Sequence, residues 1–298
     1  MAADSPGSLS KISLVLVLTL FQAAGHLNGQ EPTPPYLGEA APGRTPIPFA
    51  PHVFTRELHS SPVFAPNMTE VFWSEMEGGD IHFMTALDGR WSEPRVAPFS
   101  LPYSGEPVFA PDGNTLYFLS PHEFEGSQSR CDENVWVVAR DGEGWSDPEP
   151  LGPVVNDHPM HWGVSLAGNG NLYFGRTGES GGIFVSEFSD GHYQEPSPLS
   201  SSSNVRIEGT TPEVAADEGW LVFARGEGTS SETLDLFVTF RTPDGQWTDP
   251  VPMDGANSQE MEISPRISPD GEYLFFLRRV EDELRPFWVS ADIIQESR

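Results

Sequence analysis

The stretch Pro107-Val108-Phe109-Ala110-Pro111-Asp112-Gly113-Asn114-Thr115-Leu116-Tyr117-Phe118 decides the fold of this chain. It predicts a short strand, a Pro-Asp-Gly turn and a second strand, because Pro presets φ, Asp bonds the backbone ahead and Gly accepts a positive φ. Its closing apolar-apolar-aromatic triplet occurs five times, at spacings of 45, 56, 49 and 53 residues. The five triplets are Val71-Phe72-Trp73, Leu116-Tyr117-Phe118, Leu172-Tyr173-Phe174, Leu221-Val222-Phe223 and Leu274-Phe275-Phe276. The chain is therefore built from one repeated unit.

Each repeat predicts four strands in the same order. The third strand alternates β-branched and aromatic residues, as in Asn134-Val135-Trp136-Val137, which suits a half-buried pleated surface. An Asp-Gly turn and an aromatic-x-acid-Pro string follow, as in Trp145-Ser146-Asp147-Pro148, and Pro suits an outer strand. A period of this size filled with strands is typical of a propeller. We therefore predict an all-β fold, a five-bladed β-propeller with four-stranded antiparallel blades.

The fifth repeat is one strand short. It stops near Ser290, and no aromatic-x-acid-Pro string follows before Arg298. Such a blade would expose an unpaired edge. The segment Phe49-Ala50-Pro51-His52-Val53-Phe54 precedes the first repeat, and we predict that it is the missing outer strand. The ring would then be closed by an N-terminal strand.

The repeat with its Pro-Asp-Gly turn, over roughly residues 49 to 298, resembles the TolB-type, WD-like propeller family. The resemblance implies a periplasmic or extracellular binding propeller, and it brings no active-site residues with it. TolB itself has an additional N-terminal domain and a role in an envelope complex. This chain has only about twenty residues between its leader and the ring, so that role is not carried over.

The N-terminal segment resembles a leader. Lys11 precedes an apolar run over residues 12–21, and small residues follow at 23–25, as in a signal peptide. The run is short for a membrane span, although an uncleaved anchor is the alternative. We predict a signal peptide over residues 1–29, a Pro/Gly-rich linker over 30–48 and the propeller over 49–298. The mature chain would be periplasmic or extracellular, without a stable membrane span.

The composition limits the partners. Acidic residues number 44 against 16 basic ones, for a net charge of −28, which repels nucleic acid and anionic lipid. We expect a monomer whose partner is an envelope or secreted protein, a peptide or a glycan. The acids are spread over the turns without an Asp-x-Asp-x-Asp-Gly run, so we expect no cofactor, with Ca²⁺ as an alternative. The single cysteine, Cys131, excludes an intrachain disulfide.

The predicted binding site is the mouth of the propeller. Loops that enter the inner strands share one face with loops that join the second and third strands. The candidate ligand-binding residues there are Glu57, His59, Tyr103, Glu106, His158, His161, Trp162, Arg176, Arg206, Glu208, Arg225, Glu260, Glu262 and Arg278. Arg176, Arg225 and Arg278 occupy equivalent positions in three repeats, which suits an anionic or hydroxyl-rich ligand. Alternatively, neighbouring glutamates pair with these arginines.

The sequence contains no specific catalytic signature. Gly178-Glu179-Ser180-Gly181-Gly182 matches a nucleophile string, but it falls between two strands of one blade rather than on a strand-to-helix turn. His158 and His161 have a metal-like spacing without a third ligand nearby. We therefore predict a binding module without catalytic or metal-binding residues. The alternatives are a glycan-active enzyme that uses paired carboxylates at the mouth and a structural envelope protein.

Overall fold

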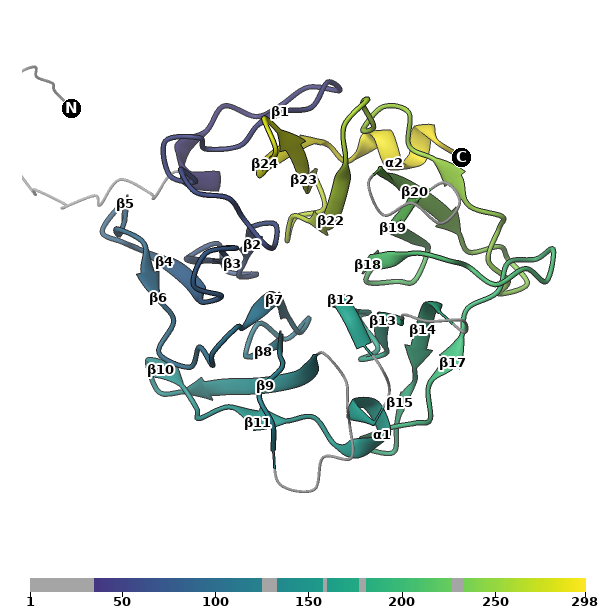
Figure 1. Cartoon of the computed structure of the whole chain (residues 1–298), viewed down its shortest axis with the longest axis horizontal. Coiled ribbons are helices and arrows are strands. Elements are labelled where there is room, and N and C mark those ends of the chain that lie inside the picture. Colours follow the sequence, from purple (N-terminus) through teal and green to yellow (C-terminus); the bar gives the residue numbers. More distant parts are fainter. Residues whose placement is uncertain (1–34, 125–132, 158–159, 177–180, 227–232) are drawn as a thin grey trace, which may run out of the picture. The chain divides into compact units, whose positions relative to one another are not determined.

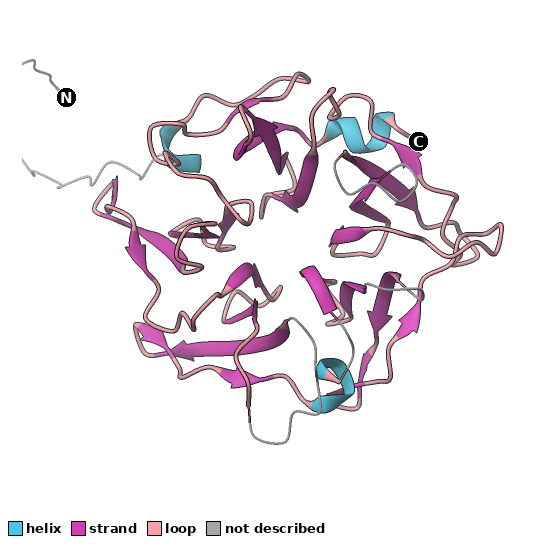
Figure 2. Cartoon of the chain, in the orientation of Figure 1, coloured by secondary structure: helices cyan, strands magenta, loops and turns pink. Residues whose placement is uncertain are grey.

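The computed structural model describes residues 35–124, 133–157, 160–176, 181–226 and 233–298, and of Met160 and His161 only the backbone. These residues form five antiparallel sheets around a central axis (Figure 1). Strands and loops make up nearly all of this part of the chain (Figure 2). The prediction of an all-β, five-bladed propeller is confirmed.

Each blade has four strands from the axis outward, and each position is filled by equivalent parts of the five repeats. The innermost strands are β2 (Val63–Phe64), β7 (Gly105–Phe109), β12 (Met160–Leu166), β18 (Thr210–Val214) and β22 (Glu262–Ile267). The second strands carry the triplets and are β3 (Glu70–Ser74), β8 (Thr115–Ser120), β13 (Leu172–Arg176), β19 (Trp220–Gly226) and β23 (Tyr273–Val280). The third strands are β4 (Ile81–Leu87), β9 (Asn134–Asp141), β14 (Gly182–Ser186), β20 (Leu234–Phe240) and β24 (Glu283–Ser290). The outer strands are β6 (Arg95–Val96), β11 (Glu149–Pro150), β17 (Ser197–Pro198), β21 (Val251–Pro252) and β1 (Ile47–Pro48).

Short elements decorate this frame. The hairpin strands are β5 (Arg90–Trp91), β10 (Gly144–Trp145), β15 (Phe188–Ser189) and β16 (His192–Tyr193). The helical turns are η1 (Tyr36–Gly38), α1 (Pro153–Asn156) and α2 (Asp292–Glu296). No helix in the described ranges has the length and apolarity needed to cross a membrane.

The triplets form the core between the blades, because both faces of the second strands are covered. Phe72 of β3, for example, packs edge-on against Trp145 of the next blade, with ring centres 6.0 Å apart. Trp247, which follows blade four's third strand, packs in the same way on Tyr173 of blade three. At these two interfaces, a blade therefore contributes an aromatic ring to the preceding blade.

The ring is closed by an N-terminal strand, as predicted, but the strand is not the predicted segment Phe49–Phe54. The residues that pair are Ile47 with Trp288 and Pro48 with Phe287, so β1 completes the blade of β24. The main-chain N–H of Phe49 then donates to the carbonyl of Pro286 at 2.8 Å. Two residues of the predicted linker are therefore strand.

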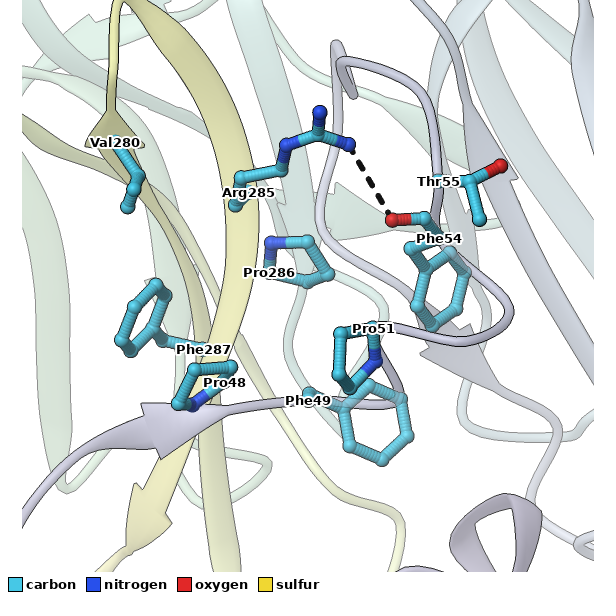
Figure 3. Close-up of a pocket in the computed structure, with 9 residues that line it drawn as sticks. All are labelled: Pro48, Phe49, Pro51, Phe54, Thr55, Val280, Arg285, Pro286 and Phe287. Carbon is cyan, nitrogen blue, oxygen red and sulfur yellow. Dashed lines mark hydrogen bonds between the residues drawn. The ribbon is translucent and has the colours of Figure 1, made fainter.

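The segment after β1 is a turn that fills the core. Ala50 has a φ of +41°, and the N–H groups of Val53 and Phe54 both donate to its carbonyl. Phe49 is fully buried against Phe275 and Trp288. Figure 3 shows Phe49 and Phe54 turned inward beside the closing strand. The aromatic residues that suggested a strand are instead anchors for the closure.

The innermost strands of four blades carry a bulge, where their pairing with the second strand shifts. In each case a residue just before a Pro or Gly has a positive φ. These residues are Glu106 (+51°), Trp162 (+55°), Thr211 (+45°) and Ser264 (+52°). The bulge interrupts the innermost strands beside the axis.

Candidate functional site

Of the fifteen non-glycine residues with positive φ in the described part of the chain, four lie at equivalent positions beside the axis. Residues other than glycine rarely adopt a positive φ, and for a β-branched residue such as Thr211 this backbone conformation costs conformational energy. The same conformation recurs at one position in four blades. Strain of this kind persists only where the surroundings fix it, and it clusters at functional sites.

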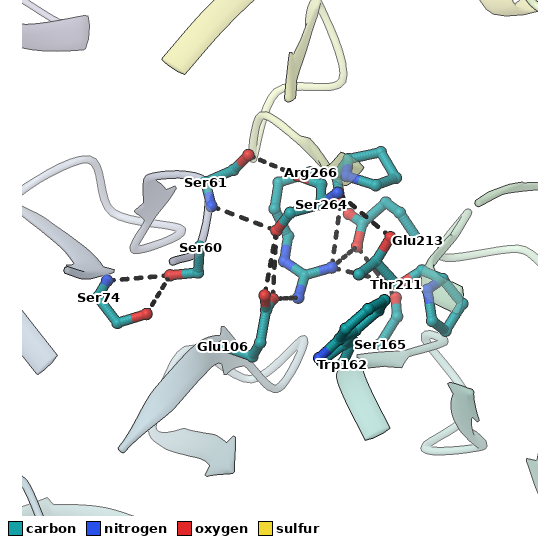
Figure 4. Close-up of polar contacts among 12 residues, drawn as sticks. Ser60, Ser61, Ser74, Glu106, Trp162, Ser165, Thr211, Glu213, Ser264 and Arg266 are labelled. Atoms are coloured by element: carbon teal, nitrogen blue, oxygen red, sulfur yellow. Dashed lines mark hydrogen bonds and ion pairs between the residues drawn. The ribbon is translucent and has the colours of Figure 1, made fainter. Parts of the chain in front are cut away.

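Arg266 of β22 lies at the centre of this region and is 1% exposed. Its Nη2 donates to Oε2 of Glu106 at 2.8 Å, and its Nη1 lies 3.4 Å from Oε2 of Glu213. Nη1 also donates to the carbonyls of Pro212 and Pro265. Figure 4 shows the guanidinium between the two carboxylates. One cation therefore joins blades two, four and five.

Hydroxyl groups extend the network to the other two blades. The Oγ of Ser264 donates to Glu106 at 3.2 Å and accepts the main-chain N–H of Ser61 from blade one. The Oγ of Ser165, from blade three, donates to Oε2 of Glu213 at 3.1 Å. The N–H of Ser264 donates to Oγ1 of Thr211. All five blades therefore meet in one buried polar network, which we call the axial network.

The axial network holds two carboxylates against one guanidinium. Burial raises the pKa of Glu213, and Arg266 together with the main-chain N–H of Ile267 opposes part of that rise. Within the described residues, the Nε of Arg266 is buried without a hydrogen-bond partner. A buried donor without an acceptor is costly, and it is uncommon in a purely structural core.

A cavity of about 260 Å³ reaches the axial network from the face that carries the Pro-Asp-Gly turns. Glu213, Arg266 and Ser165 contribute its charged and polar lining near the axis. Apolar side chains supply most of its wall, namely Val63, Phe64, Val108, Phe109, Leu166, Val214 and Ile267. Prolines of three turns, Pro66, Pro111 and Pro269, also line it. We call this cavity the axial funnel.

Known structures share this architecture. TolB from Acinetobacter baumannii superposes with a TM-score of 0.52 at 15% identity, covering 78% of this chain and 52% of that one. A putative TolB from Agrobacterium tumefaciens gives 0.52 at 13% identity, covering 79% and 78%. An alpha-L-arabinofuranosidase from Lactobacillus brevis gives 0.51 at 13% identity, covering 79% and 93%.

This likeness shows the β-propeller fold alone. The chain spans about half the length of the Acinetobacter TolB chain. No protein-family model matches the sequence, and no curated protein is significantly similar to it. The resemblance to TolB-type propellers holds at the level of the fold, and the repeat family stays a prediction.

Two of the predicted mouth residues belong to the axis. Glu106 is part of the axial network, and Trp162 has one of the strained backbone conformations. The N–H of Trp162 donates to Glu133 at 2.9 Å, and its carbonyl lies 3.4 Å from Oγ1 of Thr210. His59 packs against Gly105, the residue before Glu106. A Cβ added to Gly105 would lie 2.6 Å from the Nδ1 of His59.

Each of the three equivalent arginines packs against an aromatic ring of its own blade. Each guanidinium lies over a phenylalanine of the third strand in its own blade, at 4.4 Å for Arg176 over Phe184 and 5.3 Å for Arg225 over Phe237. Arg278 lies 4.7 Å from the ring of Phe287. It also pairs with the buried Glu262 at 2.7 Å. For Arg278 the structure therefore shows the paired alternative.

The remaining predicted residues are dispersed. Tyr103 is 74% exposed, and Arg206, Glu208 and Glu260 are exposed as well. Glu57 accepts the N–H of Leu284 at 3.3 Å. His158, Cys131 and residues 178–180 of the nucleophile-like string lie outside the described residues, as does the side chain of His161. No group of three or more His, Cys, Asp or Glu side chains in the described ranges is placed to hold a metal.

The sequence reasoning missed Ser61, Thr211, Glu213, Ser264 and Arg266. A signal for two of them was present in the repeat. In each innermost strand, one position directly follows a Pro or Gly. Blades one to three have a valine at this position (Val63, Val108 and Val164), whereas blades four and five have Glu213 and Arg266. A charged residue at a position that is apolar in the other repeats indicates a role other than packing of the core.

Proposed function

We propose that this chain is a binding module that holds its ligand at the propeller axis, and that the ligand is a peptide segment of a secreted or envelope protein. The observation that carries the proposal is the axial funnel, in which apolar walls lead to a buried, charged network. A largely apolar pocket with a few converging polar groups and a perturbed pKa is the usual form of a ligand site.

The axial network is more than the fold requires. Three blades place valine where Glu213 and Arg266 stand, so the ring can be built without these charges. Burying an ion pair is often no more stabilising than apolar packing of the same volume. The strained conformations of Glu106 and Thr211 add a further cost. Features that cost stability without being needed for the fold support a role in binding.

The lining of the funnel favours a peptide over a glycan. Its walls include Phe64, Phe109 and Ile267, which suit an apolar side chain rather than a hydroxyl-rich ring. The Nε of Arg266 offers a donor near the axis, and Glu213 offers acceptor oxygens. A main-chain amide supplies both complementary groups. The alternative binding site is the predicted mouth, on the face where loops enter the innermost strands, which we call the loop face. The exposed Tyr103 and Arg206 lie on loops of this face.

A glycan-active enzyme is the second candidate. Two buried carboxylates share one guanidinium, and burial raises the pKa of Glu213, as a general acid in a glycosidase requires. One structure with this fold is that of an alpha-L-arabinofuranosidase. Against this candidate, Arg266 holds both carboxylates, whereas a proton donor must face the scissile bond.

We also propose that the protein acts outside the cytoplasm, in the periplasm or beyond the cell. The support is the leader-like pattern of the first 29 residues and the strongly acidic composition.

Parallel arrays of peptides and glycans, with a panel of chromogenic glycosides, test these proposals. We expect binding to peptides that carry apolar side chains and no hydrolysis of any glycoside. Selective binding to glycans would overturn the ligand class. Turnover that disappears in Glu213→Gln would establish the enzyme instead.

A further inference from the structure

The interface between blades two and three contains a second cavity, distant in the fold from the axis. Its volume is about 440 Å³. It lies between β11 and α1 of blade two and the β15–β16 hairpin of blade three. Of these elements, α1 and β15 are drawn next to each other at the outer edge in Figure 1. Its walls include Tyr117, Val137, Phe188 and Tyr193. We call it the rim cleft.

The repeat explains why a cavity forms here. The aromatic residue before the acid-Pro pair is Trp91, Trp145 or Trp247 in three repeats, but Tyr193 in blade three. This residue packs on the preceding blade, as Trp247 does on Tyr173. At the interface of blades two and three, Tyr193 instead meets Tyr117 through a hydrogen bond between the two hydroxyls.

Blades two and three differ little in the surface that this residue covers. Tyr117 pairs across the sheet with Val137, and Tyr173 pairs with Val185. The covering residue differs, because Trp247 is 4% exposed whereas Tyr193 is only half-buried. A phenol is smaller than an indole, so part of the volume that a tryptophan fills remains open beside Tyr193.

The tyrosine pair in the rim cleft has one unused hydrogen-bond donor. The two phenols carry two protons, and the bond between them uses one. Within the described residues, neither hydroxyl has another partner. Burial raises the pKa of both phenols, so both protons are retained at neutral pH. Phe188, which is 42% exposed, adds an accessible aromatic wall.

We propose that the rim cleft is a second binding site, which takes an aromatic ring that carries a hydrogen-bond acceptor, as a phenol does. The apolar and aromatic walls hold the ring, and the spare tyrosine proton binds the acceptor oxygen. A sugar fits less well, because most of the lining is apolar and offers its hydroxyls no partners. Besides the two tyrosines, only Glu149 and His192 among the described residues bring polar side chains to the wall of this cleft. The site is independent of the ligand proposed for the axis.

Titration of the full chain with p-cresol and with toluene, followed by ligand-observed NMR, tests the proposal. Both ligands have the same ring and methyl group, and only p-cresol has an acceptor. We expect p-cresol to bind about three- to tenfold more tightly, which corresponds to one neutral hydrogen bond. In the double variant Tyr117→Phe/Tyr193→Phe, toluene should still bind and the advantage of p-cresol should disappear.

Two filling variants test the location. Tyr193→Trp restores the residue of the other repeats, and Val137→Phe reproduces Phe83, the partner of Phe72 in blade one. Both should abolish binding of p-cresol while the melting temperature stays at or above that of the parent. Val251→Phe, the same kind of change at an exposed site on β21, is the matched control and should bind normally.

The source of the ring is distinguished by N-acetyl-tyrosinamide. Binding of this compound at the rim cleft indicates a tyrosine side chain of a partner, whereas binding of p-cresol alone indicates a free small molecule. The proposal is overturned if p-cresol does not bind at millimolar concentration, if both filling variants bind it as the parent does, or if methyl glucoside binds more tightly.

Discussion

Arg266 lies at the axis between carboxylates from two other blades, whereas Arg225, on a second strand, lies over a phenylalanine of its own blade. The first breaks the repeat, since valine stands at that position in three blades, and the second follows a pattern shared with Arg176 and Arg278. The predicted mouth included the three arginines of this regular pattern and did not include Arg266. The difference teaches that a repeated charge can be part of the packing, while an unrepeated one marks a specialised site.

The largest expected effect is that of Arg266→Met. The change leaves Glu106 and Glu213 buried without their cation, and breaking a buried pair costs about 3–5 kcal/mol. Urea unfolding at pH 7 measures this loss. The triple variant with Glu106→Gln and Glu213→Gln should regain much of it. A loss below about 1 kcal/mol in Arg266→Met, the value typical of a surface pair, would contradict the assignment.

Arg278→Met should have an intermediate effect. Glu262 is fully buried and would lose its cation, but its bonds from Ser258 remain. We expect a loss of about 1–3 kcal/mol, the cost of leaving a buried group partly unsatisfied. The matched control is the double variant with Glu262→Gln, which should be closer to the parent in the same unfolding experiment. A double variant that is less stable than Arg278→Met would argue against this pairing.

The pH dependence of stability tests Glu213. Because burial raises its pKa, the native state binds this proton more tightly than the unfolded chain does. Ionisation therefore lowers stability as the pH rises from the usual carboxyl range through the raised pKa. The parent should lose stability relative to Glu213→Gln over that window, measured by urea unfolding at a series of pH values. Glu262 is buried in both proteins, so it contributes equally to both curves of stability against pH. Parallel curves would contradict a raised pKa of Glu213.

Arg225→Met should have the smallest effect. A cation over an accessible aromatic ring contributes about 0.5–1 kcal/mol. Phe237 is half-buried, and the methionine side chain retains most of the packing on it. The melting temperature should stay within a few degrees of the parent. A loss as large as that of Arg266→Met would mean that Arg225 and Arg266 are equally structural, and it would remove the contrast between them.

The sequence predicted the number of blades, the strand order and the closure by the N-terminus, because turns and alternation are local signals. It misplaced the closing strand, since Phe49 and Phe54 have strand-like chemistry but turn into the core. Of the axial network only Glu106 was predicted. Bonds such as that between Glu106 and Arg266 join residues 160 positions apart, and spacing along the chain carries no information about which blades meet at the axis.

The most direct test of the axial proposal is the dissociation constant of the tightest-binding peptide from the array, measured by calorimetry for two variants. Ile267→Trp extends a half-buried wall residue into the axial funnel, and Tyr103→Ala removes the most exposed aromatic residue of the loop face. We predict that Ile267→Trp weakens binding at least about tenfold, or about 1.4 kcal/mol, while Tyr103→Ala binds as the parent does. Normal binding by Ile267→Trp together with loss in Tyr103→Ala would contradict the account and assign the ligand to the loop face.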